Sequence, residues 1–200
     1  MRAGRYTAGV ATHYPASRLT GGVERQDLAA GFTVGMRFHS APVTRLADCK
    51  RIELGHTATA DGRWRLYAFA GADETLWRET LEWLASAEVS PLARHAAAGG
   101  DIGGLVDVRG TIQRAAHEAE LAEMPALLRP VTGPLGLVDY EKAFTATRTP
   151  GASEQDIFAV RGIDRAAGAM VLVRPDQYVA QALPLDATDR VRDFPAQALG

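Results

Sequence analysis

One stretch, residues 64 to 112, constrains the fold of this chain more than any other, because it reads as strand, helix, strand. It begins with the run WRLYAFAG, and alternate side chains of an extended strand point to opposite faces. One face would carry Trp64, Leu66, Ala68 and Ala70, and the other would carry Tyr67 and Phe69. A strand that is apolar on both faces is typical of the centre of a sheet covered on both sides.

A helix and a second strand follow this first strand. Asp73 is a suitable N-cap, apolar residues recur at helical spacing over residues 76–87, and the sequence VSP at 89–91 ends the helix. We expect residues 93–104, ARHAAAGGDIGG, to form a loop and residues 105–112 to form a buried strand. A unit of this kind has parallel strands joined by a right-handed crossover.

Two β-hairpins are predicted on either side of this unit. The dipeptide Asp61-Gly62 suits both central positions of a type I′ turn, so it predicts a hairpin within residues 51–70. A second hairpin is expected from residues 169–173 and 178–183, around the turn RPDQ.

The middle and the end of the domain are less regular. Pro125 interrupts residues 114–130, so these predict a helical turn followed by a loop, and GLVDYEKAF at 136–144 predicts a short strand or a turn of helix. Asp186 is expected to cap a last amphipathic helix, which Pro195 would shorten or kink.

The chain divides into two parts that differ in composition and in the periodicity of their apolar residues. Residues 1–41 carry Gly, Thr, Pro and Ser at short intervals without a sustained period, which predicts an extended N-terminal arm. Residues 42–200 then form one α/β domain. Its βαβ unit followed by two strands and a helix is the skeleton of a thioredoxin-like fold, with a mixed central sheet flanked by helices.

Composition excludes several classes of protein. The formal net charge of −2 does not favour a nucleic-acid-binding surface. The single Cys49 excludes an internal disulfide and a cysteine-rich zinc site. The amino end lacks the apolar stretch of a secretory signal, and no run is long enough for a membrane helix. We therefore expect a soluble, cytoplasmic protein.

Several stretches resemble a known family. They are AGVATHYPAS, GMRFHSAPV, ADGRWRLYAFAG, GLVDYEKAF and, most specifically, RGIDRAAGAMVLVRPDQYVAQALPL, which together span roughly residues 7–190. They resemble the C-terminal thioredoxin-like domain of FAD-dependent aromatic hydroxylases, a family that includes phenol 2-monooxygenase and 3-hydroxybenzoate 4-monooxygenase. The resemblance implies a domain that follows the flavin and substrate domains, carries no flavin itself and contributes to subunit association.

The motifs of catalysis are missing from the sequence. Thiol redox chemistry on this fold needs a thiolate where the first strand meets the helix, but residues 70–73 there read AGAD. The G-x-G-x-x-G turn that holds the pyrophosphate of FAD is absent, and GGDIGG at 99–104 precedes a strand instead of following one. We expect no catalytic residue, no metal ligand and no cofactor bound by this chain.

The sequence does suggest residues that could contact a ligand or a partner. His13, Tyr14 and Phe38 are candidates to line a cleft between the arm and the sheet, although hydrogen bonding to loop backbone is the alternative role for His13. Trp83 falls on a different helix stripe from its apolar neighbours and is a candidate interface anchor. Three arginines near the last hairpin form either a docking surface or a salt-bridged rim: Arg161, Arg165 and Arg174.

Three functions remain open at this point. The first is a non-catalytic module that associates as a homodimer or with a flavin monooxygenase component. The second is a protein that binds a small aromatic ligand, and the third is a thiol oxidoreductase working through Cys49. The sequence leaves open whether the chain is a stand-alone protein or a truncated monooxygenase, and whether the arm exchanges between subunits.

Overall fold

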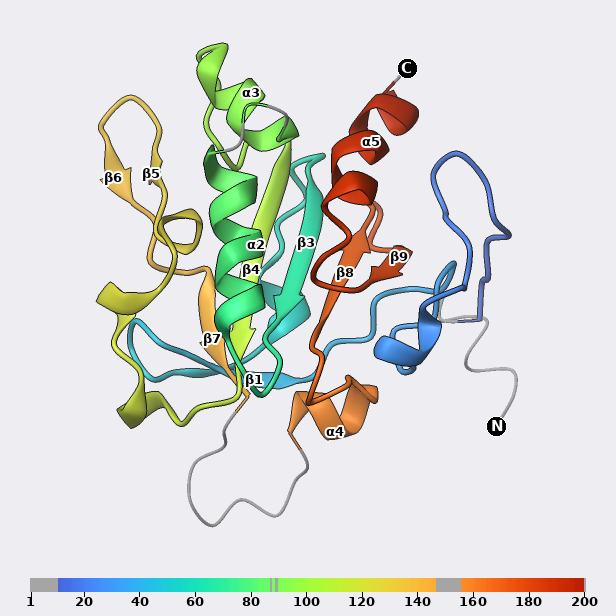
Figure 1. Ribbon diagram of the computed structural model, residues 1–200, viewed down its shortest axis with the longest axis horizontal. Helices are drawn as coiled ribbons and strands as arrows, with labels where there is room; N and C mark the ends of the chain where they lie inside the picture. Colours follow the sequence, from blue (N-terminus) through green and yellow to red (C-terminus); the bar gives the residue numbers. More distant parts are fainter. Residues whose placement is uncertain (1–10, 87, 89, 147–155, 200) are drawn as a thin grey trace.

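A mixed seven-stranded sheet forms the centre of the computed structural model, which describes residues 11–86, 88, 90–146 and 156–199 (Figure 1). The strand order is β2-β1-β7-β4-β3-β8-β9, and β5 and β6 form a separate two-stranded sheet. The strands are β1 (Pro42–Arg45), β2 (Arg51–Glu53), β3 (Trp64–Phe69), β4 (Val106–Ile112), β5 (Val131–Thr132), β6 (Leu137–Val138), β7 (Ala143–Thr145), β8 (Ala169–Val173) and β9 (Val179–Leu183). The helices are α2 (Thr75–Ser86), α3 (Pro91–Ala97), α4 (Ile157–Arg161) and α5 (Thr188–Leu199), with short 3-10 turns η1 (Gln26–Leu28), η2 (Leu54–Thr57), η3 (Ala116–Glu118), η4 (Leu121–Glu123) and η5 (Ala126–Leu128).

The predicted βαβ unit is confirmed. Every residue of β3 is buried, and β3 pairs in parallel with β4 and antiparallel with β8, which places it inside the sheet. The Asp73 carboxylate accepts the backbone N–H of Thr75 at 2.9 Å, as expected for a residue that caps the start of α2. The thioredoxin-like skeleton predicted from this unit is therefore present.

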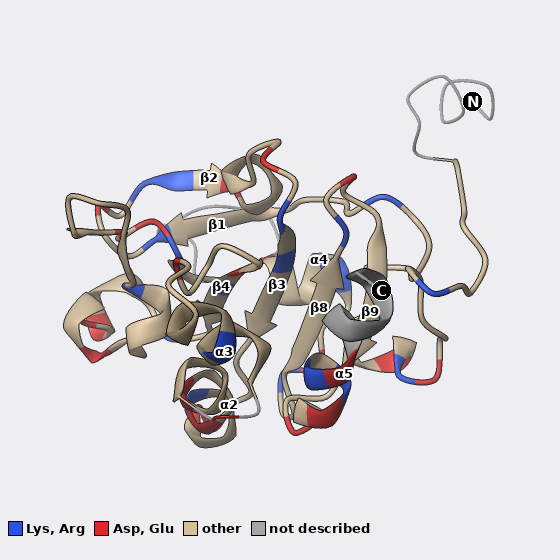
Figure 2. Ribbon diagram, turned by 90° about the horizontal axis from the view of Figure 1, so that it is seen from above, with Lys and Arg blue, Asp and Glu red and all other residues tan. Residues whose placement is uncertain are grey.

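The two faces of the sheet carry separate cores. Helices α2, α3 and α5 cover one face, and Figure 2 shows α2, α3 and α5 together on that side. The helix-face core includes Leu66, Trp77, Leu81, Val108 and Val191. The opposite face packs against α4 and the arm, and this arm-face core includes Phe32, Tyr67, Phe144, Phe158 and Val171. The alternation predicted for β3 is confirmed: Leu66 and its neighbours on one face enter the helix-face core, and Tyr67 and Phe69 enter the arm-face core.

The hairpin predicted at Asp61-Gly62 is wrong. β2 pairs with β1, while β3 pairs with β4 and β8, so the segment between β2 and β3 crosses to another place in the sheet. Gly62 has a φ of 77°, but Asp61 has no positive φ, and a type I′ turn needs it at both positions. The Asp61 side chain binds Arg63 and Arg65 instead, so its role in this turn is to hold those arginines.

The loop predicted for residues 93–104 is also partly wrong, because α3 begins at Pro91. Ser90 is its N-cap and its hydroxyl accepts the N–H of Ala93 at 3.5 Å. Proline suits the first position of a helix, where the backbone N–H has no partner within the helix. The proline that ends one helix therefore starts the next.

The remaining predictions agree more closely with the structure. β8 and β9 form the antiparallel hairpin expected around the turn at residues 174–177. Residues 114–130 form short 3-10 turns, and GLVDYEKAF contributes β6 and β7 rather than a single strand. Pro195 lies inside α5 and does not end it.

The arm belongs partly to the folded core. Leu28, Phe32 and Val34 are buried in the arm-face core, and the N–H of Gly35 donates to Val179 O at 2.8 Å. The first ten residues lie outside the described part of the chain, as do Ala87 and Val89 at the predicted end of α2. The division into an arm of residues 1–41 and a domain of residues 42–200 stays a prediction.

Candidate functional site

An apolar hairpin projects from the edge of the molecule. We use this name for residues 131–140, in which β5 pairs with β6 through Val131 and Val138 and through Thr132 and Leu137. Glycines shape its turn: Gly133 has a φ of 67°, Gly136 has a φ of 62°, and the N–H of Gly136 donates to Gly133 O at 3.2 Å. The hairpin stands apart from the seven-stranded sheet in Figure 1.

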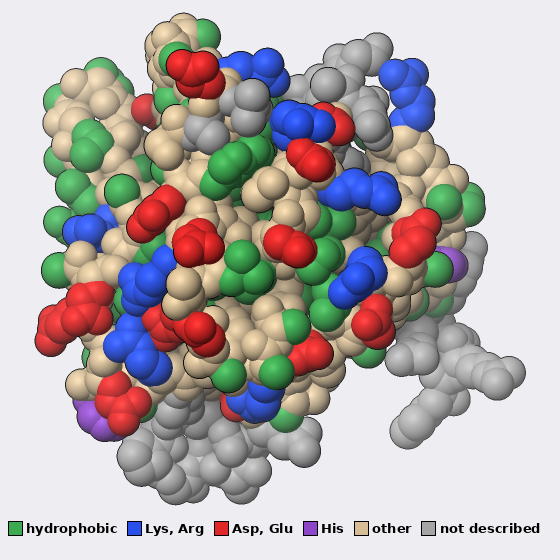
Figure 3. Space-filling view, in the orientation of Figure 1, with side chains coloured by type: hydrophobic (Ala, Val, Ile, Leu, Met, Phe, Trp, Pro, Cys, Tyr) green, Lys and Arg blue, Asp and Glu red, His purple; other side chains and the backbone are tan. Residues whose placement is uncertain are grey.

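The side chains of the apolar hairpin are largely exposed. Leu135 is 81% exposed, Leu137 is 65% exposed and Val131 is 61% exposed, and Tyr140 is about half exposed as well. Figure 3 shows hydrophobic side chains along the margin of the molecule where Figure 1 places β5 and β6. A single exposed leucine needs no explanation, but a cluster of them on one projecting element is typical of an interaction surface.

Polar contacts at its base hold the hairpin in place. The Asp101 carboxylate accepts the N–H of Gly133 at 3.1 Å, and the N–H of Asp139 donates to Pro130 O at 2.9 Å. Two-stranded hairpins are only marginally stable alone, so these contacts matter for its shape. They leave the apolar side chains on the outside.

A cluster of buried charges lies on the central strands β3 and β4 and reaches the base of the hairpin. The Asp107 side chain on β4 is fully buried, and three cations surround it: Arg65 on β3, Arg109 on β4 and Lys142 before β7. Arg109 Nη2 is 2.8 Å from Asp107 Oδ2, and the Lys142 ammonium binds Asp107 Oδ1. Lys142 also lies 3.3 Å from Asp139, so one side chain links the cluster to the base of the hairpin.

The electrostatics of this charged cluster favour the ionised carboxylate. Burial pushes the pKa of Asp107 upward, but Arg109, Lys142 and Arg65 together outweigh burial and hold the pKa below its usual value. Arg65 Nε is 3.1 Å from Asp107 Oδ2 without the alignment of a hydrogen bond, so this contact is an ion pair only. The buried carboxylate and its three cations are paired with one another, so the cluster serves the structure of the sheet.

A basic cavity of about 480 Å³ opens on the arm face of the sheet. Its walls come from the arm, from η2 and the loop after it, from β3 and from the turn between β8 and β9. Figure 2 shows basic segments of β3, the β8 end and the arm near one another. Six basic side chains contribute to the lining: Arg37, His39, His56, Arg63, Arg65 and Arg174.

Two of the predicted contact residues reach this cavity. Phe38 and Arg174 line it, and Arg174 also lies over the ring of Tyr14, with 4.9 Å between its guanidinium carbon and the ring centroid. Tyr14 itself packs edge-on against Tyr178, and His13 lies outside the lining with its Nε2 3.0 Å from Val34 O. The arm therefore contributes to the cavity through residues 37–40, Phe38 among them, and not through His13 and Tyr14.

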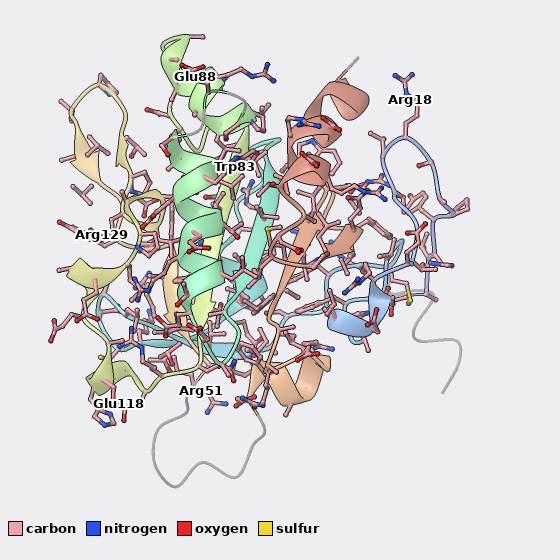
Figure 4. All side chains as sticks on the ribbon, viewed as in Figure 1. Arg18, Arg51, Trp83, Glu88, Glu118 and Arg129 are labelled. Atoms are coloured by element: carbon pink, nitrogen blue, oxygen red, sulfur yellow. The ribbon has the colours of Figure 1, made fainter. Side chains whose placement is uncertain are left out.

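The other predicted residues lie elsewhere. Trp83 is half-buried on α2, on the helix face, and lies between α2 and α5 in the view of Figure 4. Arg165 precedes β8 and binds both carboxylate oxygens of Asp156 at 2.6 Å, whereas Arg174 follows β8. Arg161 donates to Ser40 O, and burial lowers the pKa of its guanidinium despite the nearby Glu53. The three arginines do not form one cluster, and the contact role of each residue stays a prediction.

Sequence reasoning missed the apolar hairpin, the charged cluster and three arginines of the cavity. A signal for the hairpin was the pair of glycines around Pro134 and Leu135. A signal for the cluster was the alternation Val106, Asp107, Val108, Arg109, which puts two charges on one face of a buried strand. The cavity had no local signal, because its residues come from distant segments.

Neither a metal site nor a membrane-spanning helix occurs among the described residues. Among the described residues, no group of three or more His, Cys, Asp or Glu side chains is placed to hold a metal ion. No described helix has the length and apolar character needed to cross a membrane.

The curated proteins similar to this chain include several monooxygenases. A 3-hydroxybenzoate 4-monooxygenase from Comamonas testosteroni is 53% identical over 187 residues, which cover 91% of this chain and 29% of that enzyme. A FAD-dependent monooxygenase from Aspergillus terreus is 28% identical over 200 residues, covering 97% of this chain and 32% of that protein. The chain thus spans about a third of the length of these curated relatives.

Solved structures support the fold. A thioredoxin-like protein from Bacteroides caccae is 15% identical with a TM-score of 0.51, covering 85% of this chain and 51% of the other. A thiol:disulfide interchange protein from Bacteroides sp. is 13% identical with a TM-score of 0.50, covering 82% of this chain and 91% of the other. These likenesses show a thioredoxin-like fold and nothing about activity.

The match to a protein family covers almost the whole chain and agrees with the resemblance noted in its motifs. Over residues 12–199 the chain matches the family described as "Phenol hydroxylase, C-terminal dimerisation domain", and it belongs to that family.

Proposed function

We propose that this chain is a non-catalytic association module of a phenol hydroxylase-type flavin monooxygenase, and that it joins two copies through the apolar hairpin. The observation that carries the proposal is the exposure of Leu135 and Leu137 on an element whose base is fixed by backbone hydrogen bonds. The family description, a dimerisation domain, supports a second copy as the partner.

The energetics of burial agree with this use of the hairpin. Fully burying one leucine or valine side chain stabilises a complex by about 1.5–3 kcal/mol. In a two-fold symmetric dimer each residue contributes twice, so Val131, Leu135 and Leu137 would bring six apolar side chains to one interface. The free energy of this burial has to exceed the cost of association.

We further propose that the chemistry of such an enzyme belongs to other domains. Residues 70–73, where a redox thioredoxin-like protein needs its thiolate, contain no cysteine, and Cys49 lies exposed in the turn between β1 and β2. Residues 99–104 lie between α3 and β4, whereas the FAD pyrophosphate sits on a turn that follows a strand and opens a helix. The described residues of this chain do not fit a flavin site. We therefore assign FAD to the flavin domains of a longer enzyme or of a partner. We place this assembly in the cytoplasm.

Solution mass tests the proposal. Light scattering at micromolar concentration should find twice the 21.4 kDa of one chain, in a preparation without stoichiometric flavin absorbance near 450 nm. A strictly monomeric chain at high concentration would contradict the association role. Stoichiometric bound flavin would contradict the assignment of the cofactor to other domains.

A further inference from the structure

The basic cavity carries an inference that is independent of the proposed association. Four arginines and two histidines contribute to its lining, and no aspartate or glutamate does. Its volume of about 480 Å³ lies within the range of sites for small organic ligands. A cavity with such a one-sided lining attracts negative charge, because its walls concentrate the field of the basic groups.

The carboxylates around the cavity do not cancel its charge. Asp61 is shared by Arg63 and Arg65, with ion-pair distances of 2.6 and 2.8 Å. Asp107 is shared between Arg65 and two cations outside the lining. With Asp176, which pairs with Arg174, three carboxylates face the four arginines of the lining, so one positive charge is left over there.

Arg37 is the arginine with the most freedom to bind a ligand. It is half-buried, and its guanidinium donates to the neutral amide oxygen of Gln177 at 3.1 Å. Arg174, by comparison, binds Asp176 and also donates to Thr20 Oγ1, so it fastens the arm. An incoming anion can replace the amide of Gln177 at Arg37 without breaking an ion pair.

The aromatic residues of the cavity argue against a stacked aromatic ligand. The Phe38 ring is stacked between Phe32 and Tyr67, with centroid distances of 4.6 and 4.4 Å, so both of its faces are occupied. Tyr67 is only 2% exposed, and burial raises the pKa of its hydroxyl to about 12, so it stays neutral. What the cavity can offer a ligand is therefore positive charge and hydrogen-bond donors.

We propose that this cavity binds a small organic or inorganic anion with two or more acidic oxygen groups, of the polycarboxylate or phosphate class, and that Arg37 holds one of these groups. Guanidinium groups suit both carboxylate and phosphate, because they donate two parallel hydrogen bonds to either. Arg63 also lines the cavity, where it pairs with Asp61, and it is the second donor.

Titration calorimetry with citrate and with pyrophosphate tests this site, with sodium chloride keeping the ionic strength constant. Saturable binding of at least one of the two is expected, together with a higher melting temperature. Arg37→Gln should weaken that binding about tenfold, since it removes one charge-assisted contact. Arg18→Gln is the matched control: Arg18 is exposed and lies on the arm loop, as Figure 4 shows, and the change should leave binding as it is.

Three results would overturn the site. One is the absence of saturation by either anion up to about 10 mM, and another is equal binding by the wild-type chain and Arg37→Gln. The third is benzoate binding as tightly as citrate, because one carboxylate on an aromatic ring would then suffice. If Arg37→Gln does not fold, as judged by its melting without ligand, Arg63→Gln replaces it with the same expected loss. None of these results depends on whether the chain dimerises.

Discussion

Two regions of this molecule depart from the usual placement of residues, and they do so in opposite directions. The charged cluster puts Asp107 and three cations inside, while the apolar hairpin puts Leu135 and Leu137 outside. The cluster is complete within the chain, because each buried charge faces an opposite charge. The hairpin is incomplete, because hydrogen bonds fix its base but its apolar side chains remain exposed. The comparison separates a device that stabilises the fold from a surface that needs a partner.

The largest effect is expected from neutralising the centre of the charged cluster. Asp107→Asn leaves Arg65, Arg109 and Lys142 buried without their shared counter-charge, and breaking a buried ion pair in this way costs about 3–5 kcal/mol in the free energy of unfolding. Urea denaturation measures it. Asp193→Asn is the control, because that carboxylate is exposed and pairs with the half-exposed Arg192, so the change should alter stability by less than about 1 kcal/mol. A loss below about 1 kcal/mol for Asp107→Asn would mean that the cluster does not stabilise the fold.

Acidification should act on the same cluster. The pKa of Asp107 is held below its usual value, so its contribution to stability is fully present above the unfolded pKa near about 3.9 and is lost as pH falls through the folded pKa. Asp61, Glu74 and Asp156 also have lowered pKa values and act in the same direction. Urea midpoints at decreasing pH should therefore fall in the wild-type chain. They should fall less steeply in Asp107→Asn, and identical slopes would contradict the role of Asp107.

The hairpin should show the reverse behaviour, with a small effect on folding and a large one on association. Replacing Leu135 and Leu137 together by serine removes apolar surface that is already exposed, so the free energy of unfolding of the monomer should change by less than about 1 kcal/mol. The dimer should weaken by at least a hundredfold, or about 3 kcal/mol, because four leucine side chains at about 1.5–3 kcal/mol each leave the two-fold interface. Sedimentation at several concentrations measures the dissociation constant.

A matched control for the hairpin is Val160→Ser. Val160 is an exposed apolar residue on α4, 41% exposed, and lies on another element of the molecule. Its replacement should leave the dimer intact. If Val160→Ser disrupts the dimer and the hairpin variant does not, the association surface lies at α4 and the comparison fails.

The smallest effect is expected at Cys49, which belongs to neither region. Its side chain is exposed in the turn between β1 and β2, so Cys49→Ser should change the free energy of unfolding by less than about 0.5 kcal/mol. Any turnover of peroxide should be the same in both chains. A loss of turnover in Cys49→Ser would instead support the thiol oxidoreductase hypothesis.

Local patterns predicted the parts of the fold whose cause is local. β3, α2 and β4 were predicted because alternation and helical spacing are properties of neighbouring residues. The β8–β9 hairpin was predicted because its turn residues adjoin both strands. The turn at Asp61-Gly62 shows the limit: a dipeptide that allows a hairpin does not decide which strand its neighbours pair with, and long-range pairing of β3 with β4 and β8 decided otherwise.

The candidate sites were harder to predict for a related reason. Phe38 and Arg174 were named as contacts, but Arg37 and Arg63 were not, because only the folded chain brings the arm, η2 and the β8–β9 turn to one cavity. The three arginines expected as one cluster are separated, since Arg165 and Arg174 flank β8 on either side. Distance along the chain is a poor guide to distance in space once a strand intervenes.

From its residue order alone this chain could be recognised as a mixed α/β domain without a redox cysteine pair or a dinucleotide turn, since these are facts of spacing and of which residues are present. Which charges are buried together, and which leucines remain uncovered, depended on the packing of the folded chain. The reason is physical, because the burial of a side chain depends on elements that approach from distant parts of the sequence. Those elements bury Asp107 and leave Leu137 exposed.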